Sequence, residues 1–186
     1  ERLNRYYEDR GVRVRAGCKP SAIDGEPGAF VLTLENGERI EAGVLVAGIG
    51  AAPRTALAEG ASLPVDDGIV VDGALRAGGP DVYAAGDVAR YRQEALGRRV
   101  RVEHEDNALR MGERAGRNMA GEDEPYEHRP FFYSDLFDVG YEAVGDTRAE
   151  LQVISTVEDL EGKGCFFYLE DGRVRGVVTW NAFGHM

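Results

Sequence analysis

The sequence predicts an α/β region followed by an α+β region with an antiparallel sheet, and three observations lead to this fold class. An apolar run at 82–85 ends in Gly86 and Asp87, as expected of a strand covered on both faces. A helical pattern spans about residues 105–121. Beyond Pro125, short β-type segments alternate with turn signals, which is typical of an antiparallel meander.

The end of this apolar run is the first candidate ligand site. Gly86 lets a ligand approach the backbone, and Asp87 offers two acceptor oxygens at the carboxyl end of the expected strand. Open α/β sheets bind ligands at that end of their strands. A plain turn after a strand would also explain a Gly-Asp pair, so the pair gains weight only from the segments that follow.

Three local patterns organise the first fifty residues. Residues 1–10 have apolar side chains at helical spacing, and Gly11 follows as a C-cap. Residues 12–16 alternate between apolar and polar side chains, which predicts a half-buried strand. Residues 44–47 form a second apolar run and are expected to be a buried strand.

The clearest hairpin of the chain has its turn at Asn36 and Gly37. Residues 30–34 and 39–42 flank this pair with strand-forming side chains. Asn-Gly suits the two positive-φ positions of a type I′ turn, so we expect that turn here.

The segment GIGAAP at 48–53 is similar to a dinucleotide fingerprint but does not complete one. Pro53 replaces the third glycine, and no helical pattern opens directly behind it. No acidic residue ends a following strand in a βαβ unit. From the spacing alone, a glycine-rich loop stopped by Pro53 is an equally good interpretation.

The expected helix at 105–121 offers a second candidate site at its amino end. Asp106 or Asn107 can cap it, and Glu103 and Glu105 place negative charge near the positive end of its dipole. The free backbone N–H groups of its first turn can bind an anion or a polarised oxygen.

Charge and composition narrow the classes of partner. The formal net charge is −11, so we expect no nucleic-acid partner, and the basic run at 98–101 is expected to be a solvated turn or strand edge. No apolar stretch approaches the ~20 residues that span a bilayer. Cys18 and Cys165 form no Cys-x-x-Cys pair, which disfavours a thiol-based peroxidase or disulfide reductase. The expected location is the cytoplasm.

Four segments together resemble one family. They read RVEHEDNA at 101–108, PFFYSDLFDVGYEAVG at 130–145, GKGCFFYLEDGRV at 162–174 and GVVTWNAF at 176–183. They are similar to the C-terminal part of FAD-dependent pyridine-nucleotide oxidoreductases, in the branch of apoptosis-inducing factor and its bacterial relatives. The resemblance implies that 1–54 ends an NAD(P)-binding domain, 55–123 belongs to an FAD-binding domain, and 124–186 is a C-terminal interface domain cut before a terminal helix.

The resemblance also implies cofactor contacts for FAD and NAD(P)H. Asp87 would accept hydrogen bonds from the ribityl hydroxyls of FAD, and amides at the helix start would stabilise charge on the reduced ring. Tyr133 would lie beside the nicotinamide, although relatives commonly carry tryptophan there, so less stacking area is expected. No acid–base catalyst is expected. The implied contacts are Gly50, Gly86, Asp87, Glu103, His104, Glu105, Tyr133 and Glu142.

The implied activity is hydride transfer from NAD(P)H to FAD and onward to a ferredoxin, a quinone or oxygen. The FAD and NAD glycine fingerprints are both absent from this sequence, so we expect the chain alone to be inactive and to bind FAD weakly or not at all. The alternative function is a dimerisation or interaction module without catalysis of its own. Exposed sheet edges favour a homo-oligomer in either case.

Overall fold

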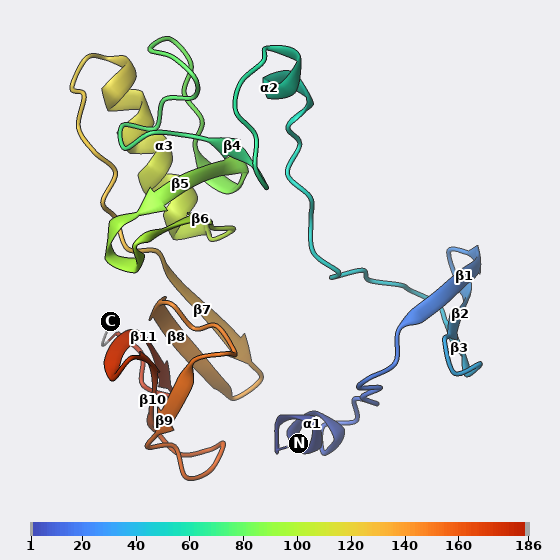
Figure 1. Ribbon diagram of the computed structural model, residues 1–186. Helices are drawn as coiled ribbons and strands as arrows, with labels where there is room; N and C mark the ends of the chain where they lie inside the picture. Colours follow the sequence, from blue (N-terminus) through green and yellow to red (C-terminus); the bar gives the residue numbers. More distant parts are fainter. Residues whose placement is uncertain (1, 185–186) are drawn as a thin grey trace. The chain divides into compact units, whose positions relative to one another are not determined.

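The structure is a computed structural model that describes residues 2–184 (Figure 1). The chain forms two compact units, Glu1–Ala51 and Ala52–Met186. The division into 1–54, 55–123 and 124–186 stays a prediction. None of the described helices is long and apolar enough to cross a membrane.

The first unit contains one helix and one antiparallel sheet. The helix forms where it was predicted, and the guanidinium of Arg10 lies 3.6 Å from the ring centre of Tyr6. The strand predicted at 12–16 is wrong, because that segment has no strand partner among the described residues. The elements are α1 (Arg2–Glu8), β1 (Pro20–Glu26), β2 (Ala29–Leu34) and β3 (Arg39–Ala42), in the sheet order β1-β2-β3.

The predicted hairpin is β2 and β3, but its turn is not of type I′. Gly37 has φ +85°, whereas Asn36 does not adopt a positive φ. The N–H of Leu34 donates to the carbonyl of Glu38, and the N–H of Gly37 donates to the carbonyl of Leu34, both at 2.9 Å. This is a three-residue loop with one left-handed glycine, in which the Asn36 Oδ1 accepts from the N–H of Glu38.

The buried strand predicted at 44–47 is also wrong. Val44 and Val46 are 78% and 88% exposed, and the segment is irregular. No described strand pairs with it, so the segment has no sheet neighbour to bury Val44 and Val46.

The second unit begins with a small mixed sheet covered by a helix. Strands β4 and β5 are parallel and β5 and β6 antiparallel. Met111 and Ala115 of helix α3 pack in a hydrophobic core with Tyr91, Leu75 and Val71. The elements are α2 (Ala56–Gly60), β4 (Ile69–Val70), η1 (Gly86–Val88), β5 (Ala89–Gln93), η2 (Glu94–Leu96), β6 (Arg98–Arg101) and α3 (Glu105–Met119).

The central strand predicted at 82–85 is reduced to a single β-bridge between Arg76 and Tyr83. The N–H of Ala84 donates to the carbonyl of Leu75 at 3.1 Å, so the segment pairs with the chain that precedes it. Ala84 is buried even though the run is not a sheet strand.

The rest of the second unit is one five-stranded antiparallel sheet in the order β7-β8-β11-β10-β9 (Figure 1). It confirms the strands predicted beyond Pro125. Trp180 is buried in it, stacks on Tyr141 with ring centres 6.3 Å apart, and donates its indole N–H to the carbonyl of Leu160 at 2.7 Å. The strands are β7 (Phe131–Leu136), β8 (Val139–Gly145), β9 (Gln152–Ser155), β10 (Gly164–Glu170) and β11 (Arg173–Trp180).

Candidate functional site

Gly86 and Asp87 open the short helix η1, which packs against the first turns of α3. Gly86 has φ +75°, a conformation that favours glycine, and a Cβ placed on it would lie 3.7 Å from the Cβ of Ala108. Its N–H lies 3.2 Å from the Sδ of Met111. The glycine-carboxylate pair and the start of the long helix are therefore side by side.

His104 is the N-cap of α3, so the cap predicted at Asp106 or Asn107 is wrong. Its backbone is extended at φ −119° and ψ 140°, and its carbonyl accepts from the N–H of Ala108 at 3.0 Å. Its side chain makes no capping bond. Because the first N–H groups of a helix have no intrahelical acceptor, the amides from Glu105 to Asn107 are donors available to a ligand.

The His104 imidazole is partly buried, and the negative charges of three carboxylates act on it. Burial lowers its pKa below the ordinary value, although the negative charges of Asp106, Asp87 and Glu103 act in the opposite direction. Its Nδ1 is buried and has no hydrogen-bond partner among the described atoms. Its ring lies 4.4 Å from that of Phe132, at an interplanar angle of 37°. The site therefore favours a neutral histidine at neutral pH.

Arg101 connects the two halves of this site, and the sequence analysis missed it. It pairs with the Glu103 carboxylate and donates from Nη1 to the carbonyl of Asp87 at 3.2 Å. The hydrogen bond to Glu103 raises the pKa of Arg101, against the effect of burial. The two-residue spacing of Arg101 and Glu103 could have indicated this pair, because residues two apart on an extended segment point to the same side.

Asp106 forms a second contact that the sequence did not indicate. Its Oδ2 lies 2.5 Å from the His128 Nε2 and accepts from the N–H of Phe131 at 3.1 Å. Burial by itself would raise the pKa of Asp106, but the hydrogen bonds from His128 and Phe131 lower it overall. These two contacts hold the segment before β7 against the first turn of α3. They thereby also position the aromatic residues that follow in β7.

Tyr133 and Glu142 face each other across β7 and β8. Tyr133 is 61% exposed, and the Glu142 carboxylate accepts from the N–H of Gly184 at 2.9 and 3.0 Å. Since successive side chains of a strand point to opposite faces, Tyr133 lies on the face opposite Phe132. It is Phe132, which was not among the predicted contacts, that reaches His104.

Of the seven predicted contacts in the second unit, five gather at one place and two do not join them. Tyr133 and Glu142 form a separate pair on the sheet. Gly50 belongs to the first unit, where it is exposed with φ +86°. The gathered residues are Gly86, Asp87, Glu103, His104 and Glu105.

The gathered residues fit a flavin in their donor and acceptor chemistry. Among the described residues, none donates a hydrogen bond to the Asp87 carboxylate, so its oxygens can accept from hydroxyls of a ligand. The amides at the start of α3 can face an oxygen that gains negative charge. The site thus offers one carboxylate acceptor and one cluster of donors at neighbouring positions.

Comparisons with known proteins identify the chain. The model "Pyridine nucleotide-disulphide oxidoreductase" matches residues 1–112, and "Apoptosis-inducing factor, mitochondrion-associated, C-term" matches 115–158. Apoptosis-inducing factor 1, mitochondrial, of Dictyostelium discoideum is 39% identical over 95% of this chain and 36% of its own length. Putidaredoxin reductase of Pseudomonas putida is 30% identical over 96% of this chain and 44% of its own.

The comparison with solved structures finds the same class of reductase as the comparison of sequences. A covalent complex of putidaredoxin reductase with putidaredoxin matches with a TM-score of 0.86 and 29% identity, over 96% of this chain and 43% of that one. The likeness confirms the predicted fold class. The chain spans about two fifths of the length of these relatives.

The family uses FAD together with NADH or NADPH, which confirms the cofactors predicted from the sequence. The family model covers more than half of the chain, and the relatives extend the match to nearly all of it. On these grounds the chain belongs to the pyridine nucleotide-disulphide oxidoreductase family.

Proposed function

We propose that this chain is part of a flavoprotein that moves electrons from NAD(P)H through FAD to a ferredoxin-type acceptor. The observation that carries the proposal is the meeting of Asp87 with the open amides of α3 around a His104 that is held neutral. The acceptor class is supported by the similarity to putidaredoxin reductase, which has been solved in complex with putidaredoxin. Quinones and oxygen stay open alternatives.

Each residue of the site has a binding or orienting role in this proposal. Asp87 accepts hydrogen bonds from ribityl hydroxyls, and Gly86 lets them approach. The amides at Glu105 and the next residues stabilise negative charge that develops on the reduced ring. FAD, when bound, supplies the two-electron chemistry that accepts hydride from NAD(P)H and passes electrons on. A neutral His104 adds no positive charge to the site and takes no proton.

The nicotinamide contacts stay a prediction. The family resemblance assigns the nicotinamide to Tyr133, to Glu103 with His104, and to Glu142, with Gly50 beside the nucleotide. The pair of Tyr133 with Glu142 across two strands is consistent with a single nicotinamide contact surface, but Phe132 is the aromatic residue that touches His104. Replacement of Tyr133 should therefore affect KM for NAD(P)H, and replacement of Phe132 the flavin spectrum.

The test uses the whole flavoprotein that contains this chain. We expect Asp87→Ala to weaken FAD binding by about tenfold or more, because a charge-assisted hydrogen bond is lost. Flavin absorbance after dialysis measures the loss, and bleaching by NADH measures the reaction. Asp81→Ala, which removes an exposed carboxylate six residues before Asp87, is the control. Full flavin retention by Asp87→Ala would reject the assigned site.

A second function, self-association through the C-terminal sheet, is favoured by its edge. All four residues of β9 are exposed, including Val153 and Ile154, and β9 pairs with β10 on one side. An open apolar edge is a template for pairing with another chain. Light scattering after size exclusion should show a dimer that Ile154→Lys dissociates, and a monomer at all concentrations would contradict it. The cytoplasmic location stays a prediction, and one relative is named as mitochondrial.

A further inference from the structure

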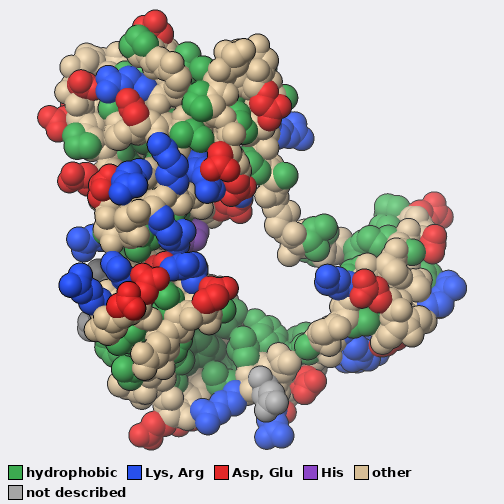
Figure 2. All heavy atoms as spheres, viewed as in Figure 1, with side chains coloured by type: hydrophobic (Ala, Val, Ile, Leu, Met, Phe, Trp, Pro, Cys, Tyr) green, Lys and Arg blue, Asp and Glu red, His purple; other side chains and the backbone are tan. Residues whose placement is uncertain are grey.

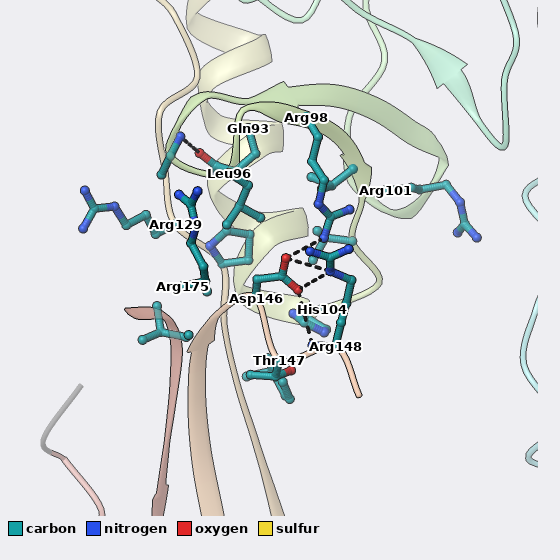
Figure 3. A pocket seen from close by; sticks show the side chains of 18 of the residues that line it. Gln93, Leu96, Arg98, Arg101, His104, Arg129, Asp146, Thr147, Arg148 and Arg175 are labelled. Atoms are coloured by element: carbon teal, nitrogen blue, oxygen red, sulfur yellow. Dashed lines mark hydrogen bonds and ion pairs between the residues drawn. The ribbon is translucent and has the colours of Figure 1, made fainter. Parts of the chain in front are cut away.

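A cavity of about 760 Å³ lies between the β5–β6 hairpin and the C-terminal sheet (Figure 3). The hairpin, the segment at Arg129 and Pro130, the loop after β8 and the first half of β11 form its walls. This volume is typical of pockets for small organic ligands, which are roughly 300–1,000 Å³.

The charge of the cavity opposes that of the protein. The chain carries a net charge of −11, but seven arginines and two aspartates line this cavity; of these arginines, Arg90 and Arg101 are paired with Asp66, Asp67 and Glu103. Figure 2 shows Lys and Arg side chains gathered across the middle of the second unit. A concave site of one sign concentrates ligands of the opposite sign.

The carboxylates near the cavity are shared among these arginines. Asp146 is buried and accepts from the Nη2 of Arg98 at 3.2 Å and the Nε of Arg148 at 2.8 Å (Figure 3). Burial would raise the pKa of Asp146, but Arg148 and Arg98 lower it, so one ionised carboxylate serves two guanidiniums. Glu170 is likewise shared by Arg148 and Arg175, at 3.5 and 3.3 Å.

Positive charge is therefore left over at the end of the cavity nearest the hairpin tip. Among the residues that the structure describes, no carboxylate pairs with Arg129. Arg98 uses one of its donors on Asp146, and its side chain is 42% exposed. Arg175 approaches from β11 on the opposite wall.

The cavity also reaches Arg101 and His104 of the proposed flavin site, and its hairpin-tip end lies farther along β6 from them. Arg98 is opposite Gln93 at the hairpin tip, whereas His104 follows six residues later along an extended segment. At about 3.3 Å per residue, the two positions are roughly 20 Å apart along the chain. Leu96 and Pro130 are apolar lining residues of this cavity, and Figure 3 shows Leu96 between Arg98 and Arg175.

We propose that the hairpin-tip end of this cavity binds a small organic dianion, a compound with two carboxylate or phosphate groups on an apolar body. Arg98, Arg129 and Arg175 bind its anionic groups, because guanidiniums with free donors match carboxylate and phosphate oxygens. Leu96 and Pro130 contact its apolar body. The site does not depend on the proposed flavin function, and it is an addition to that function.

The test compares two probes of equal shape on the 186-residue chain by isothermal titration calorimetry at low ionic strength. The probes are isophthalate, a dianion, and isophthalamide, its neutral analogue. We expect isophthalate to bind about tenfold more tightly than isophthalamide, and added salt to weaken it. Equal affinity for the two probes, or no binding of isophthalate, would overturn the proposal.

Variants locate the binding site. Arg175→Gln and Arg129→Gln should each weaken isophthalate binding by about tenfold, since each removes one charged donor. Arg92→Gln is the matched control, because Arg92 lies on the same hairpin but outside the cavity wall, and it should leave the affinity unchanged. Thermal melting of each variant checks its fold. A loss of affinity in Arg92→Gln equal to that in Arg175→Gln would also overturn the proposal.

Discussion

The two units of the chain use apolar side chains in different ways. In residues 2–51, only Tyr6 and Leu34 are buried apolar residues, and the sheet is held mainly by its strand pairing. In residues 52–184, a continuous core joins the small sheet to α3. Two similar apolar runs show the difference: Val46 is exposed in the first unit, and Ala84 is buried in the second. An apolar run therefore indicates a segment that is stabilised by burial. Whether it is buried depends on which elements pack beside it.

The largest effect should come from the core of the second unit. Met111 is fully buried, so Met111→Ala should lower the free energy of unfolding by about 2–5 kcal/mol. Val46→Ala should change it by less than about 0.5 kcal/mol, because Val46 is exposed. Urea denaturation followed by circular dichroism measures both. Equal effects would show that the run at 44–47 is covered in solution.

A smaller effect should come from the hairpin of the first unit. Gly37 has φ +85° and open space around it, so Gly37→Ala should cost about 1–2 kcal/mol from backbone strain alone. Gly48→Ala, in an open position without a positive φ, should not destabilise the unit. Amide hydrogen exchange at Leu34 reports the hairpin locally. If Gly37→Ala leaves that exchange rate unchanged, the left-handed conformation assigned to Gly37 is wrong.

The smallest effect should be a pH-dependent change in the stability of the second unit. The folded-state pKa of Asp106 is lowered, so its stabilisation is present above the unfolded value of about 3.9 and is lost as pH falls through the folded value. Asp106→Asn should therefore be less stable than the wild type at pH 7, and the difference should shrink below about pH 4. Melting temperatures from pH 7 to pH 2 test this, with Asp81→Asn as the control. A difference that is constant with pH would contradict the role of the carboxylate.

The elements that sequence patterns predicted well are those whose signals are local. The helix at Glu105–Met119 has a strong apolar stripe and a glycine after its end, and strand-forming residues flank Gly37 on both sides. Strand β1 was missed because all of its residues are exposed, so it has no apolar periodicity. The run at 82–85 became a bridge because its pairing partner is a turn rather than a strand.

The site was predicted in part for the same reason. Gly86, Asp87 and His104 lie in segments with recognisable local patterns and are brought together by the packing of η1 on α3. The contact of Asp106 with His128 joins residues 22 positions apart, and no spacing rule indicates it. The choice of Phe132 over Tyr133 as the neighbour of His104 depends on which face of β7 packs against α3, which the sequence does not specify.

The stacking of Trp180 on Tyr141 makes the chain a selective fluorescent reporter. Trp180 is the one tryptophan of the sequence, and its buried indole should emit at shorter wavelength than a solvated one. Its emission will follow melting of the five-stranded sheet and will not register changes confined to residues 2–51. Tryptophan fluorescence and far-ultraviolet dichroism recorded on one sample will therefore separate the unfolding of the two units.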